Sequence, residues 1–248
     1  IYGCLVGSEM CIRDRLSTHD EGYYNNLINL SLSKLDTRKI GFPLSKALIM
    51  REHVIAQGTI QNTRYARQYG VSMNIAGGTH HAFRDRPGAF CMLNDQAIAS
   101  NYLIDNNFAR RVMIVDLDVH QGDGTASIFE HQDSVFTVSF HAQKNYPFKK
   151  QNSDFDLPFD DNTDDRAYLK ALENHLPRLV DLFEPDFMFY LAGVDVLKTD
   201  KLGRLGLSMA GCKARDRFVL SLCKDQNIPV QVSMGGGYSI YLKEIIDA

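Results

Sequence analysis

Four short polar clusters in this sequence combine the residue types that bind metals and move protons. They are residues 77–81 (GGTHH), 116–124 (DLDVHQGDG), 193–195 (GVD) and 235–238 (GGGY). Imidazole and carboxylate groups bind catalytic metals and transfer protons, and a phenol can donate a hydrogen bond to a developing negative charge. The clusters therefore suit hydrolytic chemistry if the fold brings them together.

Asp118, His120 and Asp195 are the candidate metal ligands. Asp118 and His120 are two residues apart on an extended segment, so their side chains point the same way. Asp195 would add a second carboxylate and leave one coordination position open, as in a catalytic zinc site. Iron(II) or cobalt(II) would also suit these ligands. One Asp-x-His pattern alone is weak support, and the combination carries the prediction.

His80 and His81 are adjacent imidazoles, suited to acid–base chemistry near neutral pH. Asp116 and Asp123 could each accept an N–H from one of them, which would fix its tautomer. The alternative is that one of the two histidines is only a hydrogen-bonded structural residue.

Tyr238 follows three glycines, which could place its phenol on a turn facing the metal. There it would donate a hydrogen bond to an oxyanion. Without that context, a tyrosine after glycines is more often a packed loop aromatic.

The other histidines have no comparable partner spacing. We expect His175 on the apolar face of a helix and the remaining four on the surface or in loops: His19, His53, His131 and His141. The acidic run at 160–165 predicts a solvated loop and helix start rather than a metal site.

Five apolar runs rich in β-branched residues predict strands: 71–76, 112–119, 134–140, 186–192 and 229–234. Their near-continuous apolar character is typical of strands buried on both faces of a parallel sheet. Each polar cluster begins at or just after the carboxyl end of a predicted strand, where open α/β sheets bind ligands. We expect an open, mostly parallel α/β sheet with helices on both faces and one site at its edge.

The clearest predicted helix spans 164–183, where apolar residues recur at three- and four-residue steps. Thr163 is its expected cap, and Pro177 is expected to kink or divide it. Further helices are predicted near 44–69, 94–107 and 207–226.

Composition favours one globular domain. The chain has 248 residues, of which 44% are hydrophobic, with a net charge of -3 and no basic field suited to nucleic acid. No apolar run approaches the roughly 20 residues of a membrane span, and we identify no secretory signal. Five scattered cysteines favour a reducing, cytoplasmic location.

Five motifs, taken in their order along the chain, resemble those of a known protein family. In order, GGTHHA, AFCMLND, DLDVHQGDGT, GVDVL and GGGYS resemble the signature segments of the histone deacetylase family. VSFHAQKNYPFKK resembles the class IV-like and bacterial members, and the similarity covers 16–248. The resemblance implies an arginase-like α/β fold and a deacetylase acting on acyl-lysine proteins or acylated amines.

It also implies roles for individual residues. Zn²⁺ would bind Asp118, His120 and Asp195. His81, expected to be the less buried of the pair, would act as base and acid, while His80 stabilises charge. Asp116 and Asp123 would support the pair, and Tyr238 would polarise the substrate carbonyl. Phe90 and Tyr146 would line a narrow channel for the lysine stem. A structural K⁺ or Na⁺ would bind the following residues: Asp116, Asp118, His120, Ser139 and Phe140.

The sequence departs from the family in several places. Ala89 stands where Gly is usual, which would tighten the channel wall. Gln121 replaces a frequent histidine and is not expected to touch the metal. Residues 1–15 resemble a translated sequencing adapter and are excluded from the fold. The domain at 16–248 is therefore expected to be incomplete at both ends, without an N-terminal strand and the terminal helices.

Three different functions stay open beside acyl-lysine hydrolysis. An acidic rim binding free amines would favour an acetylpolyamine or another small amide over acyl-lysine. An inactive acyl-lysine reader would keep the fold and lose a site residue. An arginase-like two-metal ureohydrolase would need more paired aspartates at the strand ends. The oligomeric state has no signature in the sequence.

Overall fold

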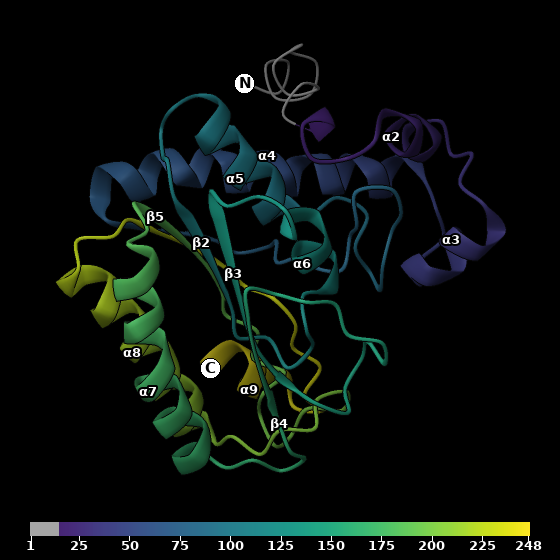
Figure 1. The fold of residues 1–248 in the computed structure, drawn as a ribbon. Coiled ribbons are helices and arrows are strands. Elements are labelled where there is room, and N and C mark those ends of the chain that lie inside the picture. The colour runs from purple at the N-terminus through teal and green to yellow at the C-terminus, as the bar shows by residue number, and fades with distance from the viewer. Residues whose placement is uncertain (1–14) are drawn as a thin grey trace.

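A computed structural model describes residues 15–248, and its centre is a six-stranded sheet with all strands parallel. The strands lie in the order β1-β6-β5-β2-β3-β4 (Figure 1). Their bounds are β1 Val71–Asn74, β2 Val112–Asp116, β3 Val135–Ala142, β4 Phe155–Phe159, β5 Phe187–Leu191 and β6 Val230–Ser233. The predicted open parallel α/β architecture is confirmed.

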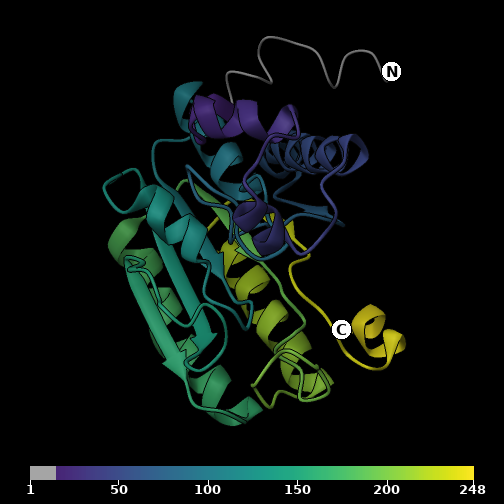
Figure 2. The same ribbon diagram turned by 90° about the vertical axis from the view of Figure 1, so that its right-hand side faces the viewer.

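Helices cover both faces of this sheet (Figures 1 and 2). The helices are α2 Glu21–Ile28, α3 Lys34–Ile40, α4 Lys46–Tyr69, α5 Asp95–Asp105, α6 Asp123–Phe129, α7 Asp165–Phe183, α8 Met209–Asp225 and α9 Leu242–Asp247. Helices α4 and α5 lie on one side, and α7 and α8 on the other (Figure 1). The short α9 lies apart from these layers, near the C-terminus (Figure 2).

The two faces of the sheet have separate hydrophobic cores because alternate strand residues point to opposite sides. On β2, Val112 and Ile114 join the core under α4 and α5, whereas Met113 and Val115 join the core under α7 and α8. Every residue of β2 and β5 is buried. These two central strands therefore give the site at their carboxyl ends a rigid base.

The five predicted strands are present, but two features of the sheet differ from expectation. β1 is an edge strand, and Val71 and Met73 are 50% and 53% exposed, so the expected burial of both its faces is wrong. β4 has no predicted counterpart. Asp156 and Pro158 interrupt its apolar pattern, which an edge strand tolerates because only one side is paired.

The predicted helices correspond to α4, α5, α7 and α8. Asp164, rather than Thr163, caps α7: its carboxylate accepts from the Ala167 N–H, while Thr163 Oγ1 donates to the Asp160 carbonyl. Pro177 does not divide α7, which continues to Phe183. His175 on this helix is partly buried and packs against Phe155 with the rings tilted and their centroids 5.1 Å apart.

The surface or loop prediction is wrong for His141, whereas His19 does lie in a loop but is buried, and His53 is partly buried on a helix. His19 is fully buried, and its ring joins the Phe83 carbonyl to the Asn94 N–H. His141 is buried on β3, and His53 lies on α4 beside the Tyr24 hydroxyl. His131 is exposed, as expected. Hydrophobic periodicity gives no warning of such burial, because it does not record the hydrogen bonds that accommodate these rings.

Most of the adapter-like segment lies outside the described residues, which begin at Arg15. Arg15 is buried, and its guanidinium donates to the Tyr24 hydroxyl at 3.3 Å. Within 15–248, no helix is long and apolar enough to span a lipid bilayer.

Candidate metal and hydrolytic site

The four polar clusters meet at the carboxyl edge of the sheet. The histidine pair follows β1, the Asp116–Asp123 segment follows β2, Asp195 follows β5 and the glycine run with Tyr238 follows β6. Because the strands are parallel, these loops leave the sheet on the same side. They line one cavity of about 460 Å³ that contains His80, His81, Asp118, His120, Asp195 and Tyr238.

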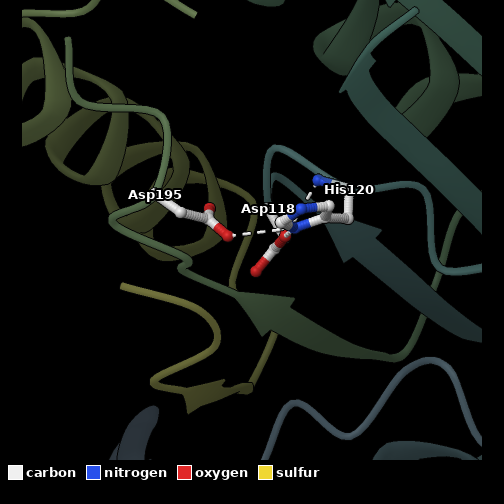
Figure 3. A group of neighbouring side chains, drawn as sticks. All are labelled: Asp118, His120 and Asp195. Carbon is white, nitrogen blue, oxygen red and sulfur yellow. Dashed lines mark hydrogen bonds and ion pairs between the residues drawn. The ribbon is translucent and has the colours of Figure 1, made fainter. Parts of the chain in front are cut away.

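Asp118, His120 and Asp195 form a compact cluster. His120 Nδ1 lies 3.0 Å from Asp118 Oδ1 and 3.2 Å from Asp195 Oδ2. One ligand atom of each residue lies within 4.8 Å of the others, the only such group of acidic, histidine and cysteine side chains in the described chain. In Figure 3, Asp195 approaches His120 from a different loop from the one that carries Asp118 and His120.

Two observations show that this cluster suits a cation. Asp195 Oδ2 is buried and has no hydrogen bond within the described chain, so it keeps a free lone pair in the cluster. A side chain at Gly236 would collide with the carboxylates of Asp195 and Asp118, and one at Gly193 would collide with Asp118. Glycine at these positions leaves room around the carboxylates.

The charges within the cluster are strongly coupled. Burial and the adjacent charge of Asp118 raise the pKa of Asp195 to about 7. Burial lowers the pKa of His120, but its hydrogen bond to Asp118 and the charges of Asp118 and Asp195 outweigh burial and raise the pKa to about 10. Without a metal, the positive charge of protonated His120 therefore offsets part of the negative charge of Asp118 and Asp195.

Each histidine of the pair is bound to its own carboxylate, as expected. His80 Nδ1 lies 2.6 Å from Asp116 Oδ2, and His81 Nδ1 lies 2.6 Å from Asp123 Oδ1. The imidazole rings are 4.1 Å apart. His81 is not the less buried of the two, because both residues are 5% exposed. The pairing leaves Nε2 of each ring available for chemistry.

The two imidazoles nevertheless differ in charge. Burial lowers the pKa of His80, but the charge and hydrogen bond of Asp116 outweigh it and raise the pKa to about 9. For His81, burial and the adjacent charge of His80 prevail over Asp123 and lower the pKa to about 4. Near pH 7, His80 is therefore a cation and His81 a neutral base.

Asp95, which the sequence reasoning missed, secures the loop that carries the histidines. This buried side chain lies at the start of α5 and accepts hydrogen bonds from Thr79 N and Thr79 Oγ1 at 2.8 and 2.7 Å. Thr59 on α4 also donates to it at 2.7 Å. Asp95 is the last residue of the AFCMLND motif, which supported the family resemblance, but the aspartate itself was given no role of its own.

Arg215 on α8 is a second missed residue. It is fully buried, and its Nη1 donates to the carbonyls of Leu117 and Gly193 at 3.1 and 2.7 Å. These carbonyls lie in the loops that carry Asp118 and Asp195. The guanidinium therefore ties together the two segments that supply the metal ligands.

Phe90, Tyr146 and Tyr238 line the cavity, as expected. The Tyr146 ring meets His81 edge-on at 4.9 Å, and the Phe90 ring lies 6.3 Å from that of Tyr238. Burial and the charges of Asp118 and Asp195 raise the pKa of Tyr238 well above its usual value, so its hydroxyl stays protonated. Ala89 also lines the cavity wall.

The residues predicted to hold a monovalent cation include two candidate metal ligands, Asp118 and His120, and three residues of the adjacent strands β2 and β3. Asp116 on β2 and Ser139 on β3 are direct register partners, and Phe140 follows on β3. Ser139 Oγ lies 3.0 Å from His141 Nδ1. Cation binding there stays a prediction. As expected, Gln121 points elsewhere: its amide donates to the Gln151 carbonyl and Asp156 Oδ1.

These features define an α/β protein with a candidate metal-binding cluster and a pair of carboxylate-bound histidines in one cavity. The sequence matches the histone deacetylase domain over residues 6–247, and the chain belongs to the histone deacetylase family. Deacetylation is the hydrolysis of an amide, and the geometry of the site is consistent with that reaction.

Individual proteins and one solved structure are also similar to this chain. An uncharacterised protein of Picosynechococcus is 41% identical over 92% of this chain and 76% of its own length. Histone deacetylase 2 of Arabidopsis thaliana is 29% identical over 91% of this chain and 60% of its own length. The solved structure of a histone deacetylase homologue from Aquifex aeolicus superimposes on this structure with a TM-score of 0.80. The two sequences are 27% identical, and the match covers 95% of this chain and 69% of that one.

Proposed function

We propose that this chain is a zinc-dependent deacylase that hydrolyses the amide bond of acyl-lysine. The observation that carries the proposal is the convergence of the Asp118–His120–Asp195 cluster, the histidine pair and Tyr238 in one cavity. Asp118, His120 and Asp195 would hold the metal, and iron(II) would also suit them. When bound, the metal would polarise the amide carbonyl and lower the pKa of a water molecule.

The protein's own groups would then handle the protons. Neutral His81 would accept a proton from the attacking water and return it to the leaving amine. His80, held as a cation by Asp116, would stabilise the negative charge that develops beside it. The Tyr238 hydroxyl would donate to the former carbonyl oxygen. The opposite charge states of the two imidazoles support this division of roles.

The cavity favours acyl-lysine over an acetylpolyamine. Phe90 and Tyr146 provide aromatic walls that would enclose an aliphatic stem. Apart from the metal and proton-transfer groups, the charged residues lining the cavity are Lys144 and Arg204. Both are cations, which would repel the free amines of a polyamine.

An inactive acyl-lysine reader and a two-metal ureohydrolase have less support. A reader should lack part of the site, whereas every expected catalytic residue lies in or beside the cavity. A two-metal ureohydrolase would need more paired aspartates at the strand ends, and within residues 15–248 the only group suited to a metal is Asp118, His120 and Asp195. Buried, unpaired Cys91, Cys212 and Cys223 support our proposal of a reducing, cytoplasmic location.

Activity and metal content together test the proposal. Purified protein should hydrolyse acetyl-lysine peptides in preference to acetylpolyamines, with longer acyl chains assayed in parallel. Activity should disappear on chelation and return with zinc. Metal analysis should give one divalent ion in the wild type and none in Asp118→Ala. Equal metal content in the two proteins would contradict the ligand assignment, and failure to hydrolyse any acyl-lysine would contradict the function.

A further inference from the structure

The mouth of the cavity carries a local excess of positive charge. Lys144 and Arg204 line it, and their side chains are 65% and 51% exposed. Lys144 belongs to the loop at 143–150, which contains three lysines and no acid. Arg204 belongs to the loop at 198–204, which contains three cations and one acid. This charge is local, because the whole chain carries a net charge of -3.

Neighbouring acids neutralise these two cations only in part. Arg204 Nη2 and Nε donate to Asp161 Oδ2 at 2.6 and 3.0 Å. Lys144 Nζ lies 3.7 Å from the same oxygen, beyond hydrogen-bond distance. Two cations thus share one carboxylate, and Lys144 is held to it more loosely than Arg204. The Asp161 contact also fixes the Arg204 guanidinium at the rim.

The acid of the second loop has partners of its own. Both oxygens of Asp200 accept backbone N–H groups, from Leu202 and Gly203 on Oδ1 and from Tyr238 on Oδ2. Asp200 therefore shapes the rim and the Tyr238 turn, and does not pair with Lys144 or Arg204. Asp200 keeps its negative charge, but its carboxylate is engaged by the backbone, so the exposed Lys144 ammonium group remains available to a ligand.

An apolar side chain lines the same mouth. Phe148 is 90% exposed and lies on the loop of Lys144. An exposed aromatic beside cationic groups suits a peptide, which offers both apolar surface and charged side chains, better than a small free amine. A neighbouring residue lies about 3.3 Å further along an extended chain, close enough to reach the rim when the acyl-lysine fills the channel.

We infer that the rim formed by Lys144 and Arg204 selects acyl-lysine peptides with a glutamate or aspartate directly beside the acyl-lysine. This inference rests on the proposed function and names the substrate class for the same site. The contact is solvent-exposed, so its effect should be modest and salt-dependent. An exposed ion pair corresponds to a change of about two- to fivefold in affinity.

Three matched peptides test the inference, with acetyl-lysine flanked on both sides by Glu, Gln or Lys. For the wild type, kcat/KM should fall in the order Glu, Gln, Lys, by about two- to fivefold at each step at low salt. The differences should shrink at high salt. Lys144→Glu should reverse the order. Lys170→Glu, an exposed change on α7 away from the cavity lining, should preserve it.

The readouts separate the inference from the proposed function. Hydrolysis of the Gln peptide tests the function, and the order of the three peptides tests the rim. Dissociation constants for the same peptides, measured by fluorescence anisotropy, give the order independently of turnover. Equal constants for the Glu and Lys peptides, or an order unchanged by Lys144→Glu, would overturn the rim assignment even if every peptide were hydrolysed.

Discussion

His80 and His81 show how the charge of a residue depends on its partners more than on its type. Each has a carboxylate at 2.6 Å, yet their pKa values lie near 9 and near 4. Once His80 takes the proton, its positive charge opposes a second proton on His81. The pair therefore contains one acid and one base near neutral pH, as acid–base catalysis requires.

Tyr238→Phe is the sharpest single-residue test of the mechanism. It keeps the ring and removes only the hydroxyl, so folding and metal content should be preserved. If the hydroxyl donates mainly in the transition state, kcat should fall by roughly 10²–10³ with little change in KM. Tyr241→Phe, an exposed tyrosine outside the cavity lining, is the matched control. Turnover within about threefold of wild type would exclude Tyr238 as the electrophilic partner.

His19 should make stability depend on pH. Burial lowers its pKa from 6.5 to about 4, and its ring must stay neutral to accept from the Asn94 N–H. Below pH 6.5 the unfolded chain gains a proton that the folded chain does not, so stability falls until about pH 4. The slope is at most about 1.4 kcal/mol per pH unit for one such group.

Urea denaturation of His19→Gln at several pH values measures this contribution. Glutamine can still donate and accept, but it does not titrate. The variant should lose less stability than the wild type between pH 6.5 and 4, although His53 and His141, whose pKa values burial also lowers to about 4, keep part of the slope. Identical slopes for the two proteins would show that His19 does not titrate on unfolding.

The loop after β6 lies against the carboxylates of the candidate metal cluster. The Gly236 N–H donates to Asp118 Oδ2 at 2.9 Å, and a side chain at this position would collide with Asp195. Gly236→Ala should therefore displace the carboxylates and weaken metal binding by roughly tenfold or more. Gly22→Ala is the control, because a methyl group there meets nothing within 4 Å and favours the helix. Competition with a metal chelator gives the metal affinities of the two variants. Equal affinities would show that the loop can move to accommodate the methyl group without weakening metal binding.

The strands were predictable from the sequence where the sheet is buried on both faces. β2 and β5 have continuous apolar runs, and the structure buries all their residues. At the sheet edges the same reasoning fails, because pairing on one side does not require a continuous apolar run. β4 contains a proline, and the apolar residues of β1 are half exposed.

Within the site, the strand-end placement of the polar clusters was sufficient to predict their convergence. The supporting residues were not predictable in the same way. Arg215 lies on a helix remote in sequence from Leu117, and Asp95 acts on Thr79 through a tertiary hydrogen bond. Such contacts depend on how helices pack on the sheet, and no local pattern in the sequence records that geometry.

At the scale of the whole molecule, the status of the N-terminal segment is directly testable. Although the family match begins at residue 6, we propose that residues 1–14 add nothing to the fold, whereas Arg15 is buried and should be retained. Deleting 1–14 should then leave the melting temperature within experimental error, because foreign residues add no native packing. Differential scanning calorimetry of the two proteins measures this. A fall of several degrees would assign the segment to the fold.

We expect the Asp118–His120–Asp195 cluster to lower the stability of the metal-free protein. Two buried carboxylates and one partly buried imidazole, from loops after adjacent central strands, carry a net negative charge, which opposes folding. A ligand that binds only the native state reverses this penalty by mass action. In a chelator, Asp195→Asn should therefore melt above the wild type. With saturating zinc the order should invert, and thermal denaturation would report metal occupancy without any substrate. A wild type that melts higher under both conditions would show that the cluster does not destabilise the metal-free protein. If the melting order inverts as expected, the supply of metal during synthesis would govern how much of the protein survives in the cell, as well as how much is active.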